Sequence, residues 1–118
     1  MVQSRGLGDV YKRQMFGYNN LVSDMRSLVV LKENDCPVVY DASHSVQRPG
    51  ANNGVSSGDR RYISPLAKAA TAVGIDALFI ESHPDPSSAI SDGDNCININ
   101  DIEGLLKEVI KIHNAVKN

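Results

Sequence analysis

The sequence predicts an α/β fold in which helices cover a parallel sheet. Two short, largely apolar runs, residues 37–40 and 77–80, have the length and composition of strands that are buried on both faces. Segments with apolar residues at helical spacing precede, separate and follow these two runs. Strands that alternate with amphipathic helices are typical of a parallel sheet. Because two strands leave unpaired edges, the sequence indicates part of a larger sheet.

The first helix is expected over residues 20–33. Asn19 or Asn20 can cap it, because an asparagine side-chain oxygen accepts a hydrogen bond from an otherwise unpaired backbone N–H group. Apolar residues then recur along one helical face, at Leu21, Met25, Leu28 and Val29. The helix is expected to stop at residues that disfavour it, Asn34, Asp35 and Pro37.

The stretch from Gln47 to Asp59 predicts a loop, because Gly, Ser and Asn dominate it. A structureless loop of this length in a compact domain is usually functional or mobile. Ser64 followed by Pro65 predicts the start of the second helix, and Gly74 predicts its end in a left-handed turn. Its expected apolar face consists of Leu66, Ala69, Ala70 and Val73.

The last third of the chain predicts a turn and a long helix. Two prolines in residues 83–86 disfavour helix at the positions before them. Asn100, with Glu103 three positions later, predicts a capping box at the start of the last helix. Glu103 and Lys107 form a favourable pair on it. Its apolar stripe is Ile102, Leu105, Leu106, Val109 and Ile110.

Composition excludes several classes of function. The chain has 118 residues, 42% hydrophobic and 22% charged, with a formal net charge of -2, which fits at most one globular domain. Scattered Lys and Arg give no basic stripe for nucleic acid, and no apolar run is long enough to span a membrane. Cys36 and Cys96 lack metal-site spacing, so reduced thiols of a cytoplasmic protein are favoured over a disulfide.

Ionisable residues follow both predicted strands. Asp41 and His44 come after the first strand, Glu81 and His83 after the second, and Asp92 in the loop beyond. Because α/β barrels build their sites at these strand ends, a histidine with carboxylates from neighbouring strands predicts a divalent-metal or acid–base cluster. The alternative is that these polar residues only solvate the rim of the sheet.

Each candidate also has a structural interpretation of its own. His44 alone could be a hydrogen-bonding histidine, whereas Glu81, directly after four apolar residues, needs a partner. His83 could brace the proline turn or take part in catalysis. Arg60 and Arg61 could bind phosphate or be ordinary surface cations.

Four long segments, in order, resemble the 3-deoxy-D-manno-octulosonate 8-phosphate synthase family, which is also called 2-dehydro-3-deoxyphosphooctonate aldolase. The resemblance covers almost all of residues 15–118, and four such motifs together are far more specific than one short pattern. The segments are MFGYNNLVSDMRSL, PVVYDASHSVQRPG, SSGDRRYISPLAKAATAVG and ALFIESHPDPSSAISDG.

The resemblance implies that residues 15–118 are the C-terminal part of a (β/α)8 TIM barrel, with about two of its strands and three of its helices. It also implies a transferase that condenses phosphoenolpyruvate with D-arabinose 5-phosphate and water and releases phosphate. This reaction leads to the inner-core sugar of lipopolysaccharide. Members of the family are typically cytoplasmic homotetramers.

The resemblance assigns roles to four residues of this chain. His44, Glu81 and Asp92 correspond to the catalytic site, and in metal-dependent members they hold one divalent metal ion. His44 also contacts phosphoenolpyruvate, and Arg60 matches a basic position that implies substrate binding. The remaining metal ligand of such members is a cysteine on the first barrel strand, and neither cysteine of this chain matches it.

Residues 1–14 are expected to be a non-native segment, because they show neither strand nor helix periodicity and DVYKRQ matches a translated sequencing adapter; the alternative is a natural N-terminal arm. In the family an Arg-Gly pair that binds the phosphate of phosphoenolpyruvate stands where this chain has residues 12–14. The chain alone is therefore expected to be inactive.

Two alternatives to this function are a sibling synthase that uses another sugar and a non-catalytic fragment or paralogue that acts as an interaction module.

Overall fold

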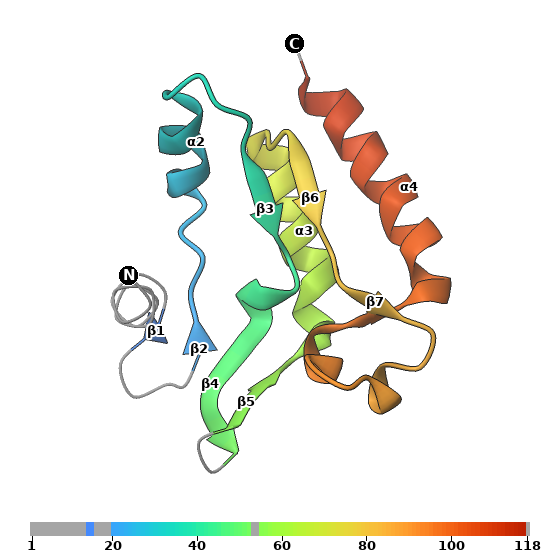
Figure 1. Cartoon of the computed structure of the whole chain (residues 1–118). Helices are drawn as coiled ribbons and strands as arrows, with labels where there is room; N and C mark the ends of the chain where they lie inside the picture. Colours follow the sequence, from blue (N-terminus) through green and yellow to red (C-terminus); the bar gives the residue numbers. More distant parts are fainter. Residues whose placement is uncertain (1–13, 16–19, 53–54, 118) are drawn as a thin grey trace.

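The structure is a computed structural model that describes residues 14–15, 20–52 and 55–117, and a parallel strand pair forms its centre (Figure 1). The elements follow one another as β1 (Gln14–Met15), β2 (Asn20–Leu21), α2 (Arg26–Lys32), β3 (Val39–Asp41), η1 (His44–Val46), β4 (Gln47–Asn52), β5 (Val55–Gly58), η2 (Arg60–Tyr62), α3 (Ile63–Val73), β6 (Ala77–Phe79), β7 (Ser82–His83), η3 (Pro86–Ser88), η4 (Gly93–Asn95), β8 (Ile97–Asn98) and α4 (Ile99–Val116).

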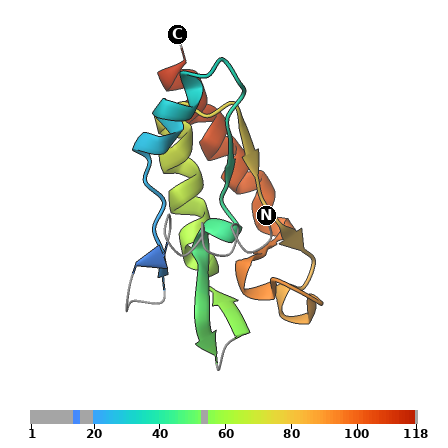
Figure 2. The same ribbon diagram turned by 60° about the vertical axis from the view of Figure 1, so that its left-hand side comes forward.

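The pair β3–β6 is the expected parallel sheet, in which Tyr40 pairs with Leu78. The strands are covered on one face only, where α3 lies (Figures 1 and 2). Tyr40 points into the core and is 6% exposed, whereas Val39 and Phe79 on the opposite face are 58% and 44% exposed. The prediction that both strands are buried on both faces is therefore wrong for this chain, because its helices pack against a single face of the pair.

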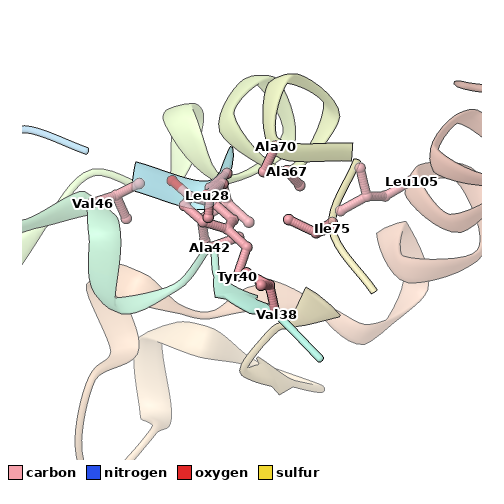
Figure 3. Packing of buried hydrophobic residues seen from close by; sticks show 10 residues of the cluster. Leu28, Val38, Tyr40, Ala42, Val46, Ala67, Ala70, Ile75 and Leu105 are labelled. Carbon is pink, nitrogen blue, oxygen red and sulfur yellow. The ribbon is translucent and has the colours of Figure 1, made fainter. Parts of the chain in front are cut away.

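The core lies between β3, α2, α3 and α4 (Figure 3). Ala67 and Ala70 of α3 are fully buried, so this helix approaches the sheet as closely as its small side chains allow. The predicted apolar face of α3 is partly wrong, because Ala69 and Val73 are exposed. The buried positions of this helix are Ile63, Ala67, Ala70 and Thr71.

The first helix is shorter than predicted. Asn20 does not cap it but belongs to β2, and the helix begins at Arg26. The Asp24 carboxylate accepts hydrogen bonds from the backbone N–H and the guanidinium of Arg26, at 3.0 and 2.9 Å. The N-cap residue itself, Met25, offers no side-chain acceptor, and Asp24 before it supplies the acceptor for the first N–H of the helix.

The other two helices begin two residues earlier than predicted, with Tyr62 and Asn98 at the cap positions in place of Ser64 and Asn100. Asp59 accepts from the N–H of Arg61 and starts the short helix η2, which leads into α3 at Ile63, ahead of the predicted Ser64-Pro65 start. In α4 the cap is Asn98, whose side chain accepts from Asn100 N at 2.9 Å. Asp59 thus caps η2 and Asn98 caps α4, each with a short polar side chain, whereas α3 continues from η2 without a side-chain cap of its own.

Two local predictions are confirmed. Gly74 ends α3 in the left-handed region, at φ 111° and ψ 51°. Lys107 donates to Glu103 at 2.6 Å on the exposed side of α4.

The predicted loop from Gln47 to Asp59 is instead a β-hairpin. Gln47 pairs with Gly58 and Asn52 pairs with Val55, so β4 and β5 are antiparallel around positions 53–54. The dipeptide Asn53-Gly54 is a strong sequence signal for a hairpin. Two-residue hairpin turns often require positive φ at both positions, and Asn and Gly are the residues that tolerate it best. The high content of Gly and Ser in this segment hides that signal.

A second parallel pair, β7–β8, joins Ser82 to Ile97 and His83 to Asn98, and no pattern in the sequence predicts it. Within the described ranges, no helix has the length and apolar character needed to cross a membrane. The segment 1–14, predicted to be non-native, lies outside the described residues except for Gln14, which pairs with Leu21.

Candidate functional site

The candidate site lies beyond the C-terminal ends of the two central strands. Asp41 is the last residue of β3, and His44 opens η1 three residues later. Glu81 follows β6, and Asp92 precedes η4. Parallel strands place their carboxyl ends at one edge of a sheet, which is why residues forty positions apart in sequence meet here.

Asp41 fixes the orientation of the His44 ring. Its Oδ2 lies 2.7 Å from His44 Nδ1, while its Oδ1 accepts from the backbone N–H groups of Ser43 and His44 at 3.1 and 2.9 Å. A carboxylate on Nδ1 favours the tautomer that carries its proton there. The lone pair of Nε2 is then left for a ligand or a proton.

The other ring nitrogen of His44 faces two carboxylates. Nε2 lies 3.4 Å from Glu81 Oε1 and 4.0 Å from Asp92 Oδ2. One possible ligand atom from each of these three residues lies within 4.8 Å of the others. The structure thus brings together the three residues that the sequence analysis selected, while their catalytic and metal-binding roles stay predictions.

The surroundings of His44 favour its protonated form. Partial burial of the ring opposes protonation, but the hydrogen bond to Asp41 and the charges of Asp41, Glu81 and Asp92 outweigh it and raise the pKa of His44 above its ordinary 6.5. The negative charges of Asp41, Glu81 and Asp92 therefore favour a positive charge on or beside the His44 ring.

Buried contacts hold the two strand ends together. Ser43 is fully buried, and its Oγ accepts from the backbone N–H of Glu81 at 2.7 Å. The His44 ring lies 5.9 Å from the Phe79 ring, centre to centre. The relative position of His44 and Glu81 is therefore set by the packing of β3 against β6.

Asp41 was a candidate without a defined role, and two further residues that contact the site, Gln47 and Cys96, were not among the candidates. Asp41 contacts His44, Gln47 donates to Asp92 Oδ1 at 3.3 Å, and Cys96 Sγ lies 3.9 Å from Glu81 Oε2. Burial, and next the charge of Glu81, raise the pKa of Cys96, so this thiol stays protonated near neutral pH. The sequence carried a signal for Asp41, which follows the first predicted strand, but none for Gln47 or Cys96.

His83 braces the turn after β7, as one interpretation of the sequence expected. Its Nδ1 accepts from the backbone N–H of Asp85 at 3.0 Å. The ring also lines an open pocket of about 410 Å³ together with Glu81 and Cys96.

In the part of the chain that the structure describes, neither Arg60 nor Arg61 forms an ion pair with Glu81 or Asp92. The Arg61 guanidinium donates to Asp59 at 2.8 Å and lowers the pKa of that carboxyl to about 2. Arg60 is exposed and lines a different open pocket, on the side of α4. Its predicted substrate-binding role stays a prediction.

The donor set fits a divalent cation. An imidazole nitrogen with two carboxylate oxygens suits ions such as Zn²⁺, Fe²⁺ or Mn²⁺, and the Asp41 carboxylate behind the imidazole is the usual outer partner of a metal-bound histidine. Within residues 20–52 and 55–117, no lysine or arginine forms an ion pair with Glu81 or Asp92. Among the described residues, the ion pairs of these two carboxylates are those with His44, when it is protonated.

Comparison with known proteins gives concordant matches. The model of the DAHP synthetase I family matches residues 5–118. The 2-dehydro-3-deoxyphosphooctonate aldolases of Legionella pneumophila strain Lens and Desulfotalea psychrophila are 62% and 57% identical over 94 and 102 residues, which are 80% and 86% of this chain but 34% and 36% of those proteins. The chain thus spans about a third of the length of these curated relatives.

Two solved structures from Thermotoga maritima share the fold. The chain superposes on phospho-2-dehydro-3-deoxyheptonate aldolase (DAHP synthase) with a TM-score of 0.72 and 28% identity, over 86% of this chain and 27% of that one. A truncated form of 3-deoxy-D-arabino-heptulosonate 7-phosphate synthase gives 0.71 and 28%, over 86% and 36%. These are TIM-barrel proteins, and the elements seen here are consistent with part of such a barrel.

Proposed function

Because this chain belongs to the DAHP synthetase I family, we propose that the whole protein catalyses the condensation of phosphoenolpyruvate with D-arabinose 5-phosphate. The products are 3-deoxy-D-manno-octulosonate 8-phosphate and inorganic phosphate, so the protein acts in biosynthesis of the lipopolysaccharide inner core. The observation that carries the proposal is the 62% identity to an aldolase named for the eight-carbon product, against 28% to one named for a seven-carbon product.

The difference between these products defines the substrate. Phosphoenolpyruvate supplies a three-carbon unit, so an eight-carbon product requires a five-carbon aldose phosphate and a seven-carbon product requires a four-carbon one. In the proposed reaction, C3 of phosphoenolpyruvate forms the new bond to the aldehyde carbon, and the aldehyde oxygen takes up a proton. The oxygen of water bonds to C2 and loses its protons as phosphate leaves with its bridging oxygen.

Within this chain, His44 Nε2, Glu81 and Asp92 would hold one divalent cation, oriented by Asp41 behind the imidazole. Such an ion supplies positive charge where negative charge develops during the reaction. Without it, the carboxylates of this site would repel two anionic substrates. Arg60 is proposed to contact a substrate phosphate as a charge-assisted donor.

The whole protein is further proposed to be a cytoplasmic homotetramer. Val29, Val30 and Leu31 of α2 are each more than half exposed, which leaves apolar surface that the rest of the protein or a second copy would cover.

Turnover tests the proposal directly. The whole protein is expected to release phosphate from phosphoenolpyruvate when D-arabinose 5-phosphate is present, and far more slowly with a four-carbon aldose phosphate. The 118-residue chain alone is expected to be inactive under the same conditions. A preference for the four-carbon sugar phosphate would indicate the related reaction that gives a seven-carbon product. No turnover with either sugar phosphate would contradict an enzymatic role.

A further inference from the structure

The base of the β4–β5 hairpin contacts the loop that carries Asp92. Gln47 and Gly58 face each other as the first pair of the hairpin, and each touches η4 or the residue before it. Gln47 Nε2 donates to Asp92 Oδ1 at 3.3 Å. A Cβ atom on Gly58 would lie 1.6 Å from Asn95 Oδ1, so the backbone of Gly58 lies directly against the side chain of Asn95.

The two contacts fall on the two ends of one short segment. Asp92 is the cap of η4 and Asn95 is its last residue, and Asn95 N donates to Asp92 O at 2.8 Å. Asn95 is 2% exposed, and its Oδ1 has no hydrogen-bond partner among the described residues. Close packing against a glycine is therefore the main constraint on this side chain.

The backbone of Asp92 adopts an uncommon conformation. It lies in the left-handed region, at φ 54° and ψ 22°, which residues with a side chain rarely adopt, although Asp and Asn do so more often than most. Such a conformation persists when the surrounding structure fixes it. Gln47 occupies Oδ1 of the carboxylate, which leaves Oδ2 as the oxygen that faces His44 Nε2.

Gln47 is also coupled to His44. Its backbone N–H donates to the carbonyl of His44 at the end of η1. One residue therefore connects the histidine, the hairpin and the aspartate of the candidate site.

We propose that the pair Gln47–Gly58 is a positioning element, which sets the place and the rotamer of Asp92 relative to His44. Any displacement of the hairpin is passed to Asp92 through the two contacts. This inference concerns the same site as the proposed function, but the coupling itself stands on the contacts within this chain.

The coupling is tested in the whole protein by hydrogen–deuterium exchange of residues 92–96. Gln47→Leu removes the donor, and Gly58→Ala forces Asn95 to move. Both variants are expected to raise the exchange rate of the Asn95 and Cys96 amides, while Ser57→Ala, a conservative change at the neighbouring position of β5, leaves it unchanged. Exchange at the wild-type rate in both variants would overturn the proposal, whether or not the protein binds metal or has activity.

A second measurement separates positioning from general stability. Co²⁺ is titrated into the substrate-free protein while its visible absorption is recorded. Loss of an outer partner of a metal site typically weakens metal affinity by about 10–100-fold, so Gln47→Leu is expected to weaken Co²⁺ binding by at least about tenfold and to shift the spectrum. Gln47→Glu, which keeps the shape but places a carboxylate against Asp92, is expected to weaken it more.

The outcomes distinguish this inference from the proposed function. Wild-type affinity and spectrum in both Gln47 variants would contradict the positioning role. If the wild-type protein itself binds no Co²⁺, the proposed metal site is contradicted. The positioning role is then tested by steady-state kinetics. The Gln47→Leu variant is expected to have a lower kcat, while KM for the sugar phosphate stays constant. If neither Co²⁺ binding nor turnover is found, the exchange rates alone decide.

Discussion

At the scale of the residue, carboxylates on both sides of the His44 ring determine its orientation and its charge. Asp41 holds Nδ1 at 2.7 Å, and Glu81 and Asp92 face Nε2. Substitution of Asp41 by Asn keeps the size of the side chain but removes its charge. We expect Asp41→Asn to lower the pKa of His44 in the metal-free whole protein, measured by NMR titration of the imidazole signal. An unchanged pKa would show that Asp41 does not set the charge of His44.

The raised pKa of His44 also predicts how pH acts. The group is protonated up to a higher pH in the folded state than the ordinary value of 6.5. In the metal-free protein the contribution of protonated His44 to stability is therefore fully present below pH 6.5 and is lost as pH rises through the folded-state pKa.

Protons compete with a metal cation for Nε2 of His44, so Co²⁺ affinity is expected to fall as pH drops through the pKa of His44. A pH-independent affinity between pH 6 and 8, measured by titration with Co²⁺, would contradict His44 as a ligand.

The two cysteines differ in reactivity for physical reasons. Cys36 is exposed, whereas Cys96 is 5% exposed and has a raised pKa. Because the thiolate is the reactive form, we expect iodoacetamide to label Cys36 much faster than Cys96 in the native whole protein. Mass spectrometry of peptides sampled over time measures the two rates, and urea provides the control, since unfolding should equalise them. Equal rates without urea would contradict the protection of the Cys96 thiol by burial.

At the scale of the element, two glycines predict opposite effects of the same substitution. Gly74 ends α3 at φ 111°, where an added Cβ is strained, whereas Gly104 lies inside α4 with open space around it. Gly74→Ala is expected to lower the free energy of unfolding by about 1–2 kcal/mol. Gly104→Ala is expected to raise it by about 0.5–1 kcal/mol. Urea unfolding of the whole protein measures both, and destabilisation by Gly104→Ala would contradict the exposed position of this residue.

The elements that were predicted correctly are those that local sequence controls. Gly74 ends a helix because only glycine easily adopts its conformation. The apolar run at 77–80 forms a strand within one residue of its predicted bounds. The hairpin was missed, although Asn53-Gly54 signals it, because the neighbouring Gly and Ser residues have low strand propensity. The helix starts were shifted because several neighbouring side chains can cap, and tertiary packing selects among them.

At the scale of the whole molecule, the central sheet is incomplete in this chain. Val39 and Phe79 lie on an uncovered face, and within the described residues each strand of the pair has one unpaired edge. Exposed strand edges with apolar side chains promote association between chains. The 118-residue chain alone is therefore expected to elute as aggregates or oligomers in size-exclusion chromatography, even at low concentration. Val39→Lys should reduce this association, and a monodisperse wild-type monomer would contradict the prediction.

The sequence by itself determined the alternation of strands and helices, the resemblance to a phosphoenolpyruvate-condensing family, and the choice of His44, Glu81 and Asp92. These follow from residue types and their order along the chain. Only the tertiary structure decided that Asp41 holds the histidine, that Gln47 contacts Asp92 and that Cys96 lies beside Glu81. Contacts between residues up to 45 positions apart depend on how β3, β6 and the hairpin pack, and no local pattern encodes that packing.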